Sequence, residues 1–350
     1  MGKNTQRKFM EEVQAIFSNT QDDIDDNGGF FDASRALKAY LIENNNSYLP
    51  QIPGYSDWTP LEDVRNWYSA YNIDNPHQYV IYDNSLGRVG ILYTMLKVKN
   101  IDGFVDKWIS QTPNLDHCWL SKKQLMSFSC REDWFEKGIG LRYRNILGKF
   151  NKKEDTPTLS LKAWYGSGTA DDWKTILTPI KEEAALSSIR WQRLNDYSES
   201  QLTTEWYNYG KVTVNFAEDV TEAMREISAM AYNYYTSLVE VEKERDRKLC
   251  AFELGFSKTI DLEAFSKYVV SGRSNLKLWM VETEVYHDFR RFRGVDLHTW
   301  DPIYLDISTD YAYLTVPQKS CVNAAPRIAV IQSENTAGNT TIEFDGVSVF

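Results

Sequence analysis

The sequence predicts an α+β protein with a helical N-terminal region, one or two ferredoxin-like (split βαβ) units and a β-rich C-terminal region. Three observations carry this prediction: helical spacing of apolar residues near the N-terminus, a strand–helix–strand–strand–helix order after residue 150, and alternating apolar residues beyond residue 276. A chain of 350 residues is expected to form about two to three domains. We therefore divide it into residues 1–74, 75–150, 151–272 and 273–350.

The first region is predicted to be helical. Apolar residues in the segment 9–17 recur at the spacing of one buried helix face. The segment 37–41 repeats this spacing and predicts a second helix, capped by Asp32 or Ser34. The Thr-Pro-Leu-Glu sequence at 59–62 predicts a third helix, because it offers an N-cap, a proline at the first helical position and a capping-box glutamate.

The second region is predicted to be a small α+β unit. Its helix is expected around residues 101–109, where apolar residues share one face. A capping box formed by Ser121 and Gln124 predicts a second, short helix. Strands are expected at residues 79–82, 89–93, 118–120 and 139–143.

The third region carries the order typical of a ferredoxin-like unit. After a polar joint at 151–156, its strands are predicted at 159–165, 188–194 and 212–216, and its helices at 170–183 and 219–248. A hairpin is expected at 207–210. The long helix has a wide apolar stripe, which favours a place in the core over a surface for a partner.

The last region is predicted to be a sheet packed on the core. A short helix from Asp261 to about Gly272 precedes it. Strands are expected at residues 276–280, 303–307, 311–315, 327–331 and 341–350.

Composition limits the functions that the chain can have. Its 49 acidic residues outnumber the 39 basic ones, which argues against a general nucleic-acid coat protein. The four cysteines lie far apart and form no C-x-x-C pair, so reduced thiols and a cytoplasmic location are predicted. A polar N-terminus and the lack of a long apolar run predict neither a secretory signal nor a membrane span. No motif implies a small-molecule cofactor.

Two short clusters are weak candidates for chemistry. Asp116, His117 and Cys118, with Cys130 further along, could form a nucleophile pair or half a zinc site. The favoured interpretation is a strand end with Cys118 in the core and His117 at the surface, since neighbours in a strand point to opposite faces. The glycine-containing loop 164–169 is interpreted as a turn between a strand and a helix, with phosphate binding as the alternative.

The richest cluster lies at residues 282–301. Three arginines interleaved with rings could grip phosphates while the rings stack on bases. The anion- or nucleic-acid-binding residues of this Arg/aromatic strip are Tyr286, Phe289, Arg290, Arg291, Phe292 and Arg293. An alternative is a divalent-metal site for a hydrolase or phosphodiesterase. Its ligands would be His287, Asp288, Asp296, His298 and Asp301. The remaining interpretation is a hairpin whose arginines form cross-strand ion pairs.

The sequence therefore favours a non-catalytic component of a larger assembly. This component would bind a protein partner, or nucleic acid, through the Arg/aromatic strip. The competing hypothesis is the metal-dependent hydrolase.

Overall fold

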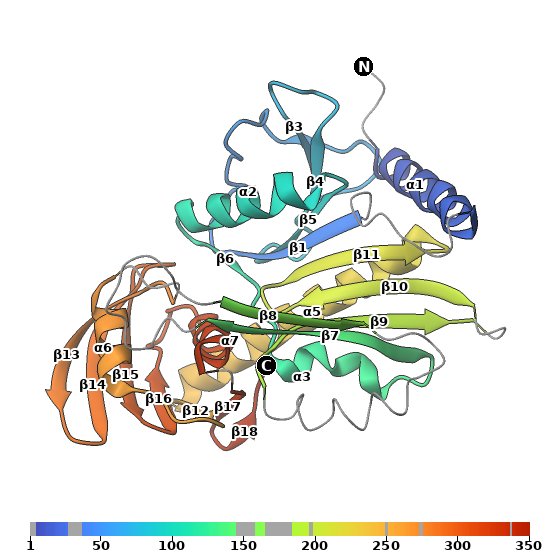
Figure 1. Ribbon diagram of the computed structural model, residues 1–350. Coiled ribbons are helices and arrows are strands. Elements are labelled where there is room, and N and C mark those ends of the chain that lie inside the picture. The colour runs from blue at the N-terminus through green and yellow to red at the C-terminus, as the bar shows by residue number, and fades with distance from the viewer. Residues whose placement is uncertain are drawn as a thin grey trace. The chain divides into compact units, whose positions relative to one another are not determined.

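A computed structural model describes residues 5–26, 37–144, 158–164, 184–195, 199–248, 251–272, 276–336 and 338–350 (Figure 1). Helices and antiparallel strands occur together, so the predicted α+β class is confirmed. The helices are α1 (Gln6–Asp26), α2 (Val98–Gln111), α3 (Lys122–Leu125), α5 (Val220–Lys248), α6 (Leu262–Val270) and α7 (Ala324–Thr336), with a 3₁₀ turn η2 (Ser127–Cys130). The strands up to α5 are β1 (Leu37–Asn44), β2 (Thr59–Pro60), β3 (Trp67–Tyr71), β4 (Tyr79–Asp83), β5 (Val89–Thr94), β6 (Leu115–His117), β7 (Trp134–Arg144), β8 (Thr158–Trp164), β9 (Leu186–Leu194), β10 (Ser200–Tyr207) and β11 (Lys211–Ala217). Those after α5 are β12 (Phe252–Phe256), β13 (Leu278–Val285), β14 (Phe289–Asp296), β15 (Asp301–Ser308), β16 (Tyr311–Thr315), β17 (Thr340–Phe344) and β18 (Val347–Ser348).

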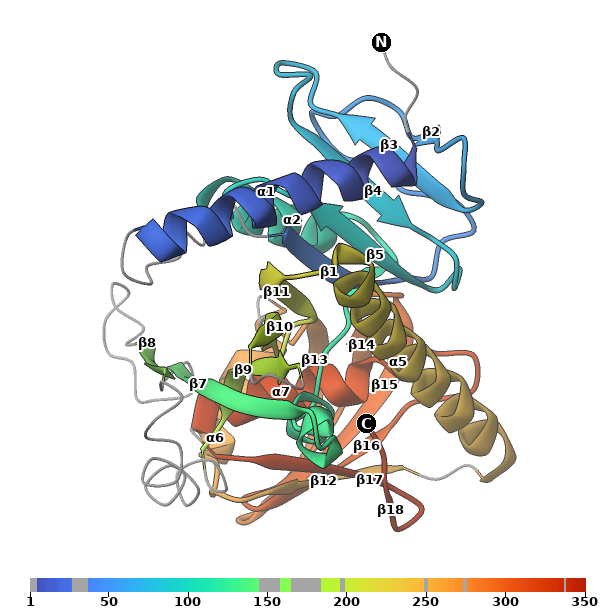
Figure 2. The ribbon, with the colours of Figure 1, turned by 90° about the vertical axis from the view of Figure 1, so that its right-hand side faces the viewer.

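The chain forms two compact units. The first comprises residues 1–118, 128–136 and 190–235, and the second comprises 119–127, 137–189 and 236–350. The long helix α5, a continuous helix in Figure 2, begins in the first unit and ends in the second. Its first turn is capped by Asp219, whose carboxylate accepts the N–H of Thr221 at 2.8 Å. The helix predicted at 219–248 is thus confirmed.

The first unit is built around β1. In this unit the strands follow the order β2-β3-β4-β5-β1-β11-β10, and β6 also pairs with β1. All eight residues of β1 are buried. The helix predicted at 37–41 is therefore wrong: a strand buried on both faces does not show the alternation of a half-exposed strand, so periodicity does not separate it from a buried helix.

The third helix predicted for the N-terminal region is also wrong. Thr59 and Pro60 form β2, at the end of the strand order, and pair with β3. An edge strand tolerates proline because its outward N–H groups need no partner in the sheet. Trp67 in β3 stacks on Tyr93 of β5, with ring centroids 5.6 Å apart. The strand pairing of β2 with β3 therefore replaces the predicted helix start.

Two amphipathic helices of the first unit are confirmed. In α1, Phe9, Val13 and Phe17 are buried, as the helical spacing predicts. In α2, four predicted apolar residues join the core that contains Tyr40 and Leu92; they are Ile101, Val105, Trp108 and Ile109. The apolar stripe of α2 packs against the sheet of the same unit, and burial of this stripe is the main contribution that stabilises the helix.

The second unit contains a second antiparallel sheet. Its described strands follow the order β13-β14-β15-β16-β12-β17-β18. The inner face packs against helices, with α6 touching β13 and β14 and α7 touching β12 and β17. The strand predicted at 327–331 is wrong, because these residues belong to α7. Eleven of its 13 residues are buried, so no polar face reveals the helical period.

Several other predictions can be followed in the structure. The strands at 79–82, 89–93, 139–143, 188–194, 212–216, 303–307 and 311–315 are confirmed as parts of β4, β5, β7, β9, β11, β15 and β16. Ser121 and Gln124 form the predicted capping box of α3. The strand expected at 118–120 is wrong, because β6 ends at His117.

Part of the ferredoxin-like prediction falls outside the described residues. The polar joint 151–156 and the helix at 170–183 both lie there. The split βαβ topology therefore stays a prediction. Among the described residues, no helix has both the length and the apolar character needed to cross a bilayer.

Candidate functional site

The Arg/aromatic strip lies on the β13–β14 hairpin of the second unit, and its side chains divide between the two faces of the sheet. Phe292 points to the inner face, where it is fully buried and meets Phe265 of α6 with ring centroids 6.1 Å apart. It cannot stack on a base, so its predicted role is corrected to a core residue. Tyr286 is exposed, and its hydroxyl donates to Glu284 at 3.2 Å.

Two of the three arginines are held by carboxylates of the same sheet. Arg290 pairs with Glu282 at 3.0 Å. Arg291 donates to both oxygens of Asp306, at 2.9 and 3.2 Å, and to Glu284 at 2.8 Å. The hydrogen bond from Arg291 also lowers the pKa of Glu284. These are the cross-strand ion pairs of the third interpretation, and they neutralise most of the charge that would attract a phosphate.

The remaining residues of the strip lie on the outer face. Arg291 lies over the ring of Phe289, 5.7 Å from its centroid. Arg293 is exposed and lies between Val281 of β13 and Tyr304 of β15 in the register of the sheet. The outer face therefore presents Arg293 beside apolar and aromatic side chains, together with Arg291, which is engaged by carboxylates.

The five residues of the predicted metal site do not gather. His287 and Asp288 precede β14, whereas Asp296, His298 and Asp301 lie at or beyond its other end. An eight-residue strand spans about 26 Å at roughly 3.3 Å per residue. Within the part of the chain that the structure describes, no three of these five place ligand atoms within 4.8 Å of one another. The geometry does not favour the metal-dependent hydrolase built on this set.

The cluster around Cys118 is structural in the first unit. Cys118 is fully buried, as predicted, and burial is the largest cause that raises the pKa of its thiol. His117 is also buried, so its predicted place at the surface is wrong. The Nε2 atom of His117 lies 3.3 Å from Asp106, and its ring meets the edge of Tyr209. Cys130 is exposed, and loop residues 165–169 lie outside the described residues.

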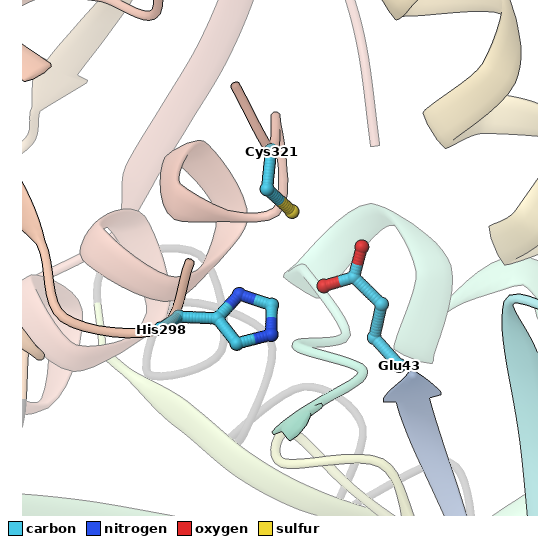
Figure 3. Close-up of side chains that lie close together, drawn as sticks. All are labelled: Glu43, His298 and Cys321. Atoms are coloured by element: carbon cyan, nitrogen blue, oxygen red, sulfur yellow. The ribbon is translucent and has the colours of Figure 1, made fainter. Parts of the chain in front are cut away.

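The second unit contains a thiol–imidazole pair that sequence reasoning did not identify. The Sγ atom of Cys321 and a ring nitrogen of His298 lie within 4.8 Å of each other. Figure 3 shows the two side chains extending from separate segments of this unit. His298 follows β14, and Cys321 lies just before α7. Figure 3 also draws Glu43, which belongs to the first unit. The carboxylate of Glu43 accepts hydrogen bonds from Nε and Nη2 of Arg88 at 2.9 and 2.7 Å.

A buried ion pair joins the two segments that carry this thiol–imidazole pair. Asp296, at the end of β14, accepts the backbone N–H of His298 at 3.0 Å. The same carboxylate oxygen accepts Nη2 of Arg327 in α7 at 2.6 Å, and Arg327 also donates to the carbonyl of Leu276 at 2.9 Å. The Arg327 and Asp296 side chains are 0% and 4% exposed. Asp296, predicted as a metal ligand, therefore uses this carboxylate oxygen to hold the loop after β14 to α7.

The comparisons with known proteins identify a family. The chain matches the MJECL33-like protein family over residues 2–337 and belongs to that family. It is similar to the uncharacterized protein MJECL33 of Methanocaldococcus jannaschii, with 22% identity over 361 residues, covering 88% of this chain and 86% of that protein. No solved structure matches the chain.

Proposed function

We propose that this protein is a component of a larger assembly and binds a protein partner through the outer face of its second sheet. The supporting observation is a set of exposed side chains on four adjacent strands, which we call the outer patch. The outer patch consists of Trp279, Val281, Arg293, Tyr304 and Tyr313. A cytoplasmic setting, predicted from the sparse cysteines, is part of this proposal.

The composition of the outer patch favours a protein over other partners. Trp279, Val281, Tyr304 and Tyr313 are 57%, 61%, 40% and 41% exposed. Large exposed apolar groups that lie side by side mark interaction surfaces. Trp, Tyr and Arg are also the residue types that most often dominate the binding energy of protein interfaces. An apolar contact surface with a carboxylate opposite Arg293 would be complementary.

The partner is expected to cover the face of the sheet and not to extend its edge. β13 is the edge strand, but its register shifts between Glu282 and Glu284. Bulges and charged side chains on an edge strand disfavour pairing with a further strand. Nucleic acid is a weaker candidate because Arg290 and Arg291 are engaged by carboxylates and the chain has a net charge of −10.

A photo-crosslinking experiment on the full chain tests this proposal. A benzophenone amino acid replaces Val281, and a matched control carries it in place of Tyr232, which is 56% exposed on α5. We expect one defined protein to be linked from position 281 and not from position 232. Adducts with nucleic acid, or no adduct specific to position 281, would contradict the proposal.

A binding measurement with that purified protein sharpens the test. Trp279→Ala is expected to weaken the complex by about 30-fold, the effect of an interface residue contributing about 2 kcal/mol. Tyr232→Ala is the matched control and should leave the dissociation constant unchanged in calorimetry. Equal effects of the two variants would exclude the outer patch as the interface.

A further inference from the structure

We propose that Cys321 and His298 form a nucleophile–base pair that takes an acyl group from an ester or thioester. This would be a second activity, separate from partner binding, and would contradict the expectation of a non-catalytic chain. A thiol becomes a strong nucleophile when a neighbouring base accepts its proton. The Sγ atom of Cys321 and a ring nitrogen of His298 lie within 4.8 Å, and catalytic hydrogen bonds are often long until substrate binds.

The position of Cys321 before α7 favours the thiolate. The backbone N–H of Asn323 points to Sγ of Cys321 at 3.4 Å. The 13-residue helix α7 begins at Ala324, so its partial positive end lies close to the sulfur. Cysteines at helix N-termini and beside histidine have lowered pKa values.

The two partners are held by contacts that do not depend on a ligand. The Asp296–Arg327 ion pair joins the backbone of His298 to the helix that follows Cys321. Arg245 of α5 donates to the carbonyl of Ser320, the residue before Cys321. The ion pair thus holds the segment that carries His298, and Arg245 holds the residue before Cys321, although these two segments lie far apart in the sequence. Such preorganisation is what a nucleophile and its base require.

The chemistry balances without a metal or a redox partner. The imidazole of His298 takes the thiol proton, and Sγ of Cys321 forms a bond to the acyl carbon. The bond from that carbon to the leaving alcohol or thiol breaks, and the imidazolium returns its proton to the leaving group. Water then attacks the thioester with His298 as base, which releases a carboxylic acid and restores the thiol.

A small acyl ester tests this proposal on the full chain. Cys321 is only 6% exposed, so the probe must be small, and 4-nitrophenyl acetate meets this requirement. We expect a burst of 4-nitrophenolate and an acetyl group on Cys321 in peptide mass spectrometry. His298→Gln is expected to slow acetylation of Cys321 by about 100-fold, the usual contribution of a general base. Cys130→Ser is the matched control and should leave the burst unchanged, because Cys130 lies in the other unit and takes no part in the thiol–imidazole pair.

A second measurement needs no variant and keeps the proposal testable if the buried substitutions unfold the chain. At pH 6.5, iodoacetamide should modify Cys321 at least about 10-fold faster than Cys130, despite its burial, because a free thiol ionises near pH 8.5. Slower alkylation of Cys321 than of Cys130 would overturn the proposal. Acetylation of Cys321 that is unchanged in folded His298→Gln, or stoichiometric zinc that protects the thiol, would also overturn it.

Discussion

Two arginines of the second unit make the same kind of contact in opposite surroundings. Arg291 meets Asp306 on the outer face of the sheet, where the two side chains are 37% and 32% exposed. Arg327 meets Asp296 between the sheet and α7, where they are 0% and 4% exposed. Exposed ion pairs contribute about 0–1 kcal/mol because water solvates both charges. Water does not reach the charges of a buried pair, so each charge depends on its partner and the pair holds the two segments together.

The largest expected effect comes from breaking the buried pair. Arg327→Met leaves the Asp296 carboxylate without its cation and should destabilise the protein by about 3–5 kcal/mol. Arg291→Met is the matched control and should cost less than about 1 kcal/mol. Urea unfolding followed by circular dichroism measures both. Similar losses for the two variants would remove burial as the reason for the difference.

A second contrast lies within the Arg/aromatic strip. Phe292→Ala should destabilise the protein by about 3–5 kcal/mol, since the ring is fully buried against α6. Phe289→Ala should cost less than about 1 kcal/mol, because the ring is only partly buried on the outer face. The urea midpoints of the two variants give this comparison. A larger loss for Phe289→Ala would show that the division of the strip between two faces is incorrect.

A smaller effect tests whether the exposure of a residue alone decides how much it contributes to the free energy of unfolding. The carboxylate of Asp261 is exposed, yet it accepts the N–H groups of Glu263 and Ala264 at the start of α6, both at 3.0 Å. Asp261→Ala should cost about 1 kcal/mol, because these N–H groups have no partner within the helix. Asp288→Ala, in the turn before β14, is the control and should stay within about 0.5 kcal/mol. Thermal unfolding of both variants is the measurement.

The smallest effect concerns reactivity and not stability. Burial raises the pKa of Cys118, so its thiol should stay protonated at pH 8 and resist iodoacetamide in the folded protein. Cys130 is exposed and should react at the ordinary rate of a free thiol. Mass spectrometry before and after addition of urea should show Cys118 reacting only once the first unit unfolds. Rapid modification of Cys118 in the folded state would contradict its place in the core.

Sequence patterns were reliable where an element has two different faces. The helix α2 and the strands β15 and β16 alternate between core and solvent, and each was predicted from that alternation. The patterns failed where an element is buried on every side. β1 is a strand whose apolar spacing suggests a helix, and α7 is a helix whose apolar run suggests a strand. Periodicity carries no information when no side of the element faces water.

The candidate sites show the same limit. For residues 282–301 the sequence leaves a hairpin with cross-strand ion pairs as one of three interpretations, and the pairing of β13 with β14 shows this hairpin. His298 was named for a metal site, but Cys321 was not linked to it. No local spacing connects these two residues, since the contact depends on how α7 packs beside the loop after β14.

The sequence by itself determined the α+β class, the capping box of α3 and the strands with one solvent-exposed face. These features follow from interactions between residues close together in the chain. Only the tertiary structure decided that Phe292 is a core residue, that Asp296 pairs with Arg327 and that Cys321 lies beside His298. The physical reason is burial: desolvation of a charge or ring is set by distant segments that exclude water.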